Sequence, residues 1–108
     1  MTNVGLFYLY GGIFLILLAL PLYFGKVKPN PFYGFGFFTR NTDVWYAVNK
    51  VSAGWMIVTG VLTVFITIAL AFVPNLSADA YENTCTVIFW GGITIGGIAT
   101  WKYMIDRL

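Results

Sequence analysis

Three long runs without a charged side chain set the fold of this sequence. They cover residues 4–24, 51–73 and 83–101, and each is mostly apolar. At a rise of about 1.5 Å per residue, roughly 20 helical residues cross a hydrocarbon core of about 30 Å. A helix also satisfies its own backbone polar groups, as lipid surroundings require. The runs therefore predict an all-α integral membrane protein with three transmembrane helices at about these positions, in a single domain of residues 1–108.

The composition favours the same class of protein. Of the 108 residues, 59% are hydrophobic and 9% are charged, whereas an ordinary soluble domain has about 25% charged residues for its water-facing shell. A net charge of only +2, with no basic patch among aromatics, argues against a nucleic-acid partner. The first run lacks a basic start and exceeds the apolar length of a secretory signal, so we expect a retained span rather than a cleaved leader.

The basic residues predict the orientation. They are Lys26, Lys28, Arg40 and Lys50, between the first two runs, and Lys102 and Arg107, after the third. The connection between the second and third runs has no basic residue but carries Asp79 and Glu82. By the positive-inside rule this predicts a multi-pass protein of the cell membrane, with its N-terminus outside and its C-terminus in the cytoplasm. Trp45 and Tyr81 flank the runs and are expected at the headgroup level.

The connection at residues 25–50 is predicted to be a cytoplasmic elbow. Two prolines prevent the first helix from continuing, and an unusual density of aromatics follows, with two glycines among them: Pro29, Pro31, Phe32, Tyr33, Gly34, Phe35, Gly36, Phe37 and Phe38. Asn41 or Thr42 is expected to cap a short helix that leads into the second span. Two interpretations stay open: an amphipathic elbow that locks the first helix to the second, or a ligand-binding element.

The same connection resembles the signature of the SdpI-type membrane proteins. The matching residues are Asn30, Tyr33, Gly34, Phe35, Thr39, Thr42, Trp45 and Asn49. The family's arginine directly after Gly-Phe is replaced here by Gly36, and Arg40 follows four residues later. The resemblance implies immunity to a secreted peptide toxin, or sensing of one. It also implies a set of ligand- or partner-binding residues: Asn30, Tyr33, Gly34, Phe35, Thr39, Arg40, Trp45 and Asn49.

Small residues recur within the spans at the spacing of one helix face. Gly92, Gly96 and Thr100 are four apart in the third run, and Gly60 belongs to a similar strip in the second. Such strips let two helices approach closely. They predict helix packing at these four residues, either within the chain or against another chain, and an oligomer stays open.

The sequence has few side chains of the types that carry out catalysis. The sequence has no histidine, a single cysteine (Cys85) and four acidic residues, and it contains no nucleophile-and-base arrangement. We therefore expect no enzyme, no cofactor and no metal site, and the uncharged spans argue against ion transport by this chain alone. The leading hypothesis is an SdpI-like protein that meets a peptide toxin. The alternative is a small accessory subunit of a larger membrane complex, with other membrane subunits as its partners.

Overall fold

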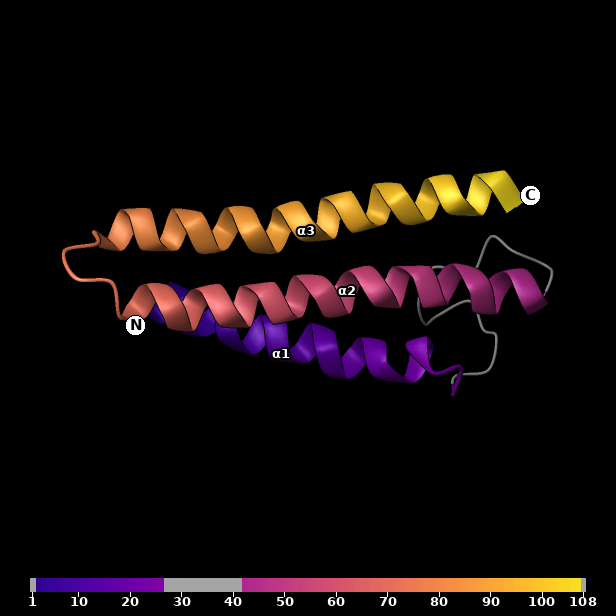
Figure 1. Ribbon diagram of the computed structural model, residues 1–108, viewed down its shortest axis with the longest axis horizontal. Coiled ribbons are helices and arrows are strands. Elements are labelled where there is room, and N and C mark those ends of the chain that lie inside the picture. The colour runs from indigo at the N-terminus through magenta and orange to yellow at the C-terminus, as the bar shows by residue number, and fades with distance from the viewer. Residues whose placement is uncertain (1, 27–41, 108) are drawn as a thin grey trace.

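The computed structural model describes residues 2–26 and 42–107. It contains α1 (Asn3–Tyr23), α2 (Thr42–Ala71) and α3 (Ala78–Arg107) (Figure 1). Each helix includes a stretch long and apolar enough to cross a membrane. The predicted all-α class with three such helices is therefore confirmed.

Local sequence explains where α1 begins and ends. The Thr2 hydroxyl caps the first turn by accepting a hydrogen bond from the Gly5 backbone N–H, at 3.0 Å. At the other end Gly25 adopts φ +68°, a left-handed conformation that glycine reaches without cost. The Gly25 N–H then donates to the Leu22 carbonyl and the Lys26 N–H to the Pro21 carbonyl. These two bonds form a Schellman motif, which stops the helix directly after its apolar run.

The other two helices are longer than the apolar runs that they contain. Both α2 and α3 have 30 residues, or about 45 Å at 1.5 Å per residue, which exceeds a core of about 30 Å. α2 already begins at Thr42, so residues 42–50 of the predicted elbow are helical. α3 extends past both ends of the predicted 83–101, and the Ser77 hydroxyl caps it by accepting from the Ala80 N–H. Asp43 and Asp79 lie in the first turns, where a negative charge is favoured.

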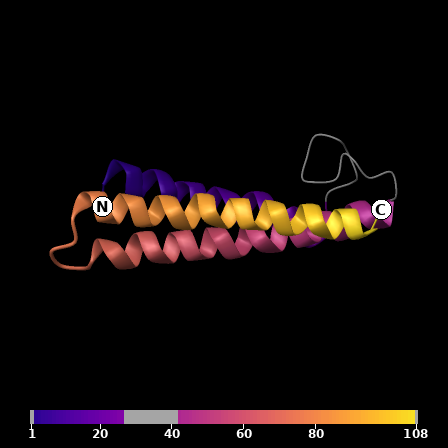
Figure 2. The ribbon, with the colours of Figure 1, turned by 90° about the horizontal axis from the view of Figure 1, so that it is seen from above.

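α2 is the central helix of the bundle. It packs along both α1 and α3, whereas α1 and α3 contact each other much less. The molecule is elongated, with extents of 52 × 23 × 17 Å, and the two long helices run side by side (Figures 1 and 2). One end, here named the basic end, carries Lys26, Lys50 and Lys102. The opposite end, named the acidic end, carries Asp79 and Glu82, close to the α2–α3 connection.

The interior consists of two small buried clusters. The cluster at the acidic end contains Tyr8, Tyr81, Cys85 and Phe89, and the one at the basic end contains Ala19, Leu22, Trp45 and Ala53. Many large apolar side chains point outward instead; Phe65 on α2, for example, is 67% and Val87 on α3 70% exposed. Apolar helix surfaces of this kind are consistent with contact to lipid.

Candidate functional site

The described structure covers two of the eight ligand- or partner-binding residues that the family resemblance implies. Trp45 and Asn49 lie one turn apart on α2, and their side chains are 3% and 0% exposed. The Asn49 amide donates to the Trp45 carbonyl at 2.8 Å, and Trp45 belongs to the buried cluster with Ala19 and Leu22 of α1. The other six predicted residues lie outside the described part of the chain: Asn30, Tyr33, Gly34, Phe35, Thr39 and Arg40.

Two aromatics expected at the headgroup level, Trp45 and Tyr81, are buried within the bundle. Trp45 is 3% and Tyr81 5% exposed. The Tyr81 hydroxyl donates to the Thr67 carbonyl at 2.6 Å, and the Tyr81 ring covers Gly5 of α1. Tyr81 therefore joins all three helices at the acidic end. Both side chains therefore pack between helices, and their expected depth at the headgroup level stays a prediction.

The predicted packing glycines lie close to a neighbouring helix, Gly60 against its backbone and Gly92 and Gly96 against side chains. A Cβ atom on Gly60 would lie 2.6 Å from the Gly12 carbonyl oxygen of α1. On α3, a Cβ on Gly92 would lie 2.5 Å from Thr59 Oγ1, and one on Gly96 would lie 2.8 Å from Trp55 Cβ. Each position faces a neighbouring helix with no room for a methyl group.

Thr100, the fourth predicted packing residue, is fully buried. Its hydroxyl donates to the Gly96 carbonyl one turn earlier, at 2.7 Å. This bond satisfies the hydroxyl within its own helix, so the side chain needs no polar partner from a neighbour.

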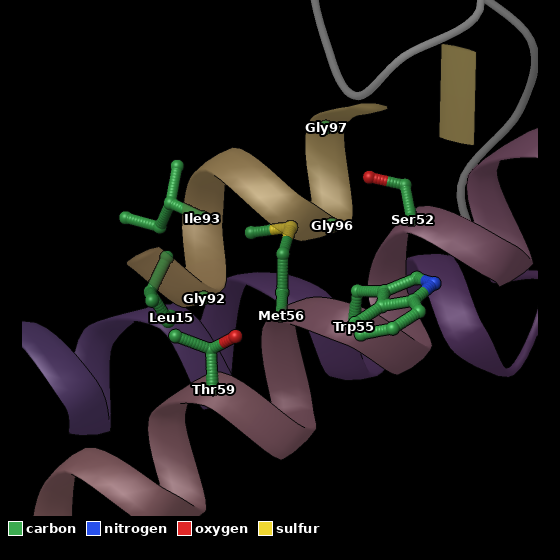
Figure 3. A pocket seen from close by; sticks show the side chains of 9 residues that line it. All are labelled: Leu15, Ser52, Trp55, Met56, Thr59, Gly92, Ile93, Gly96 and Gly97. Carbon is green, nitrogen blue, oxygen red and sulfur yellow. The ribbon is translucent and has the colours of Figure 1, made fainter. Parts of the chain in front are cut away.

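A half-open cavity of about 210 Å³ lies between α2 and α3 beside these glycines (Figure 3). Its walls come mainly from α2 and α3, with one residue from α1: Leu15, Ser52, Trp55, Met56, Thr59, Gly92, Ile93, Gly96 and Gly97. The lining is mostly apolar, and the side chains of Ser52 and Thr59 supply two hydroxyls. A cavity of about 150 Å³ already holds a benzene-sized group. This one can therefore hold a large apolar side chain next to hydrogen-bonding groups.

A polar cluster that the sequence did not suggest joins α1 to α3 at the acidic end. The Tyr8 hydroxyl forms hydrogen bonds with Thr86 Oγ1 (3.1 Å) and Trp90 Nε1 (3.0 Å). Tyr8 is 7% exposed and packs against Phe89, with ring centroids 5.2 Å apart. No signal in the first run distinguishes Tyr8 from the exposed Tyr10, because both stand among apolar residues.

The described residues include one free thiol and no clustered metal ligands. Cys85 is a free, buried thiol within the acidic-end cluster. Among residues 2–26 and 42–107, no group of three histidine, cysteine, aspartate or glutamate residues is placed to hold a metal ion. One feature suited to bind a ligand is the cavity between α2 and α3. No protein-family model, curated protein or solved structure matches this chain.

Proposed function

We propose that this chain is an SdpI-like, non-catalytic protein of the cell membrane that gives immunity to a membrane-active peptide or senses it. The observation that carries the proposal is one continuous face of α2. Residues 45, 49, 52, 56 and 59 follow each other at alternating spacings of four and three, which places them in one stripe. The stripe begins with Trp45 and Asn49 of the family-like motif and continues into the cavity wall.

The cavity is the proposed contact for the peptide. A peptide that inserts into the bilayer brings apolar side chains and needs partners for its polar groups. The cavity provides an apolar wall together with the hydroxyls of Ser52 and Thr59. Because α2 packs on both other helices, a shift of α2 on binding is proposed to reach the part of α2 that carries Trp45 and Asn49.

The proposed orientation places the basic end in the cytoplasm and the N-terminus outside. Lys26, Lys50 and Lys102 support it, because basic residues concentrate on the cytoplasmic side. In this arrangement the predicted elbow of residues 25–50 faces the cytoplasm, where a sensor would pass on its signal. The acidic end, with the α2–α3 connection, would meet the peptide's side of the membrane.

The orientation is testable with single cysteines in a Cys85→Ala background. We expect Asp79→Cys to react with a membrane-impermeant maleimide in intact cells. Lys26→Cys should react only after the cells are permeabilised. Both residues are exposed at opposite ends of the bundle, so accessibility within the protein does not limit either reaction. Labelling of Lys26→Cys alone in intact cells would reverse the proposed orientation.

Filling the cavity is expected to abolish protection. A Cβ atom on Gly97 meets no atom within 4 Å, and Gly97 lines the cavity. Gly97→Leu therefore adds a side chain in the cavity without forcing the helices apart. Sensitive cells that produce the wild-type chain should survive the secreted peptide fraction of the source organism, whereas Gly97→Leu cells should be as sensitive as cells without the chain.

Gly91→Leu is the matched control. Gly91 is also on α3 and has equally open space around it, but it does not line the cavity. Cells that produce the Gly91→Leu variant should therefore be protected like cells that produce the wild type. Equal protection by both leucine variants, at equal amounts in the membrane, would rule out the cavity as the peptide contact.

The particle extracted in mild detergent separates the proposal from its alternative. Native mass spectrometry should find the chain alone or with copies of itself, and the chain expressed alone should protect. A large particle with other subunits at fixed stoichiometry would instead identify an accessory subunit. The close-packed glycines and the exposed apolar faces would then be its docking surfaces.

A further inference from the structure

A second hollow, here named the basic-end groove, lies between the end of α1 and the first half of α2. It has a volume of about 590 Å³ and opens outward from the bundle. Its lining consists of Tyr23, Lys50, Val51, Gly54, Trp55 and Val58. Apart from the Lys50 ammonium and the tyrosine hydroxyl, the lining is apolar, and the groove is separate from the cavity except for the shared Trp55.

Lys50 is held at the mouth of this groove. Its Nζ atom lies 5.3 Å from the centroid of the Tyr23 ring, which is within the range of a cation–π contact. The residues one turn away on α2 are Tyr46, Ala47, Ala53 and Gly54, none of which carries a carboxylate. The ammonium is therefore oriented by an aromatic ring, and no carboxylate of its own helix lies within one turn of it; the nearest in sequence is Asp43, two turns earlier.

The groove has the length and position of a lipid site in one leaflet. From Lys50 to Val58 it follows α2 for about 12 Å at 1.5 Å per residue, and half of a hydrocarbon core is about 15 Å. Gly54 keeps its floor low, because a Cβ atom there would meet only Tyr23 Cε2, at 3.9 Å. An acyl chain can therefore lie against Val51, Gly54 and Val58 with its headgroup beside Lys50.

We infer that the basic-end groove binds one anionic phospholipid, with its phosphate paired to the Lys50 ammonium and an acyl chain along α2. A zwitterionic lipid fits less well, because it brings a positive group to an end where Lys26, Lys50, Lys102 and Arg107 outnumber the acidic Asp43 and Asp106. Each basic residue near a membrane surface is worth about 1 kcal/mol towards anionic lipid. This inference does not depend on the proposed immunity or sensing function.

The role of the Lys50 charge is tested with the full chain. The protein is equilibrated in mixed phosphatidylglycerol and phosphatidylcholine micelles, and the lipids that it retains are identified by native mass spectrometry. The wild type should retain phosphatidylglycerol in preference to phosphatidylcholine by about fivefold, the factor that about 1 kcal/mol represents. Lys50→Gln should lose that preference, and Lys50→Arg should keep it. Lys102→Gln, at the same end but outside the groove, should also keep it.

The groove itself is tested with Gly54→Leu, which fills the floor while leaving Lys50 in place. It should lower the retention of both lipids severalfold, whereas Gly91→Leu should match the wild type. Far-UV circular dichroism checks that each variant keeps its helices. An unchanged preference in Lys50→Gln, an equal loss in Lys102→Gln, or full retention in folded Gly54→Leu would each overturn the inference.

Discussion

Replacing Gly60 with leucine is expected to destabilise the bundle by about 3 kcal/mol, the upper part of the usual range for overpacking. Even the first carbon of a new side chain would lie 2.6 Å from the Gly12 carbonyl oxygen and 2.7 Å from Ile16 Cγ1. The carbonyl belongs to the α1 backbone and cannot turn aside, so the two helices must separate. α1 has little other support, since it contacts α3 much less than α2.

An alanine series makes this expectation quantitative. Gly60→Ala should cost more than Gly12→Ala, because the Gly12 Cβ would meet its nearest atoms at 3.0 Å rather than 2.6 Å. Gly91→Ala, in open space, should cost nothing measurable. The loss in unfolding free energy of each variant is measured in a detergent titration monitored by circular dichroism, and the three losses are then compared. Equal costs at all three positions would mean that α1 and α2 do not meet at Gly60.

The number of helices could be predicted from the sequence because it depends on a simple length requirement. The start of α2 at Thr42 agrees with the short helix expected to lead into the second span, whereas the extent of α3 beyond residues 83–101 was not predicted, because its outer turns are not apolar. Those turns depend on capping and charge instead, as with Ser77 and Asp79 at the start of α3. Hydropathy locates the part of a helix that lies in lipid and leaves open how far it continues into water.

The inward-facing residues were harder to predict for a physical reason. In water, a helix shows its buried face by an apolar stripe, but in lipid both faces are apolar. Tyr8 and Tyr10 therefore look alike in sequence, although Tyr8 is 7% and Tyr10 66% exposed. Small-residue spacing was more informative, because close helix packing favours glycine whatever the solvent. It indicated Gly60, Gly92 and Gly96, and also Gly12 and Thr59 on the facing helices, but not Trp55, which is a large residue.

The contact between Gly92 and Thr59 is expected to show strong energetic coupling. Gly92→Ala should cost about 2 kcal/mol, since its methyl group would lie 2.5 Å from Thr59 Oγ1 and 2.6 Å from Thr59 Cγ2. Thr59→Ala removes both atoms and leaves only the Thr59 Cβ, at 3.0 Å. Combining the two changes should therefore recover about 1 kcal/mol relative to the sum of the single variants, as neighbours in contact do.

Gly96→Ala supplies the matched comparison for this cycle. Its methyl group would meet Trp55 Cβ at 2.8 Å, with no Thr59 atom among its nearest neighbours. Its cost should therefore add to that of Thr59→Ala without recovery.

The unfolding free energies should be measured on the chain diluted in detergent, where contact with a second chain is minimised. Coupling of Thr59 to Gly92 but not to Gly96 would locate this packing within one chain. Additive costs in both pairs would contradict the α2–α3 contact and favour a role for the α3 glycines in docking onto another chain.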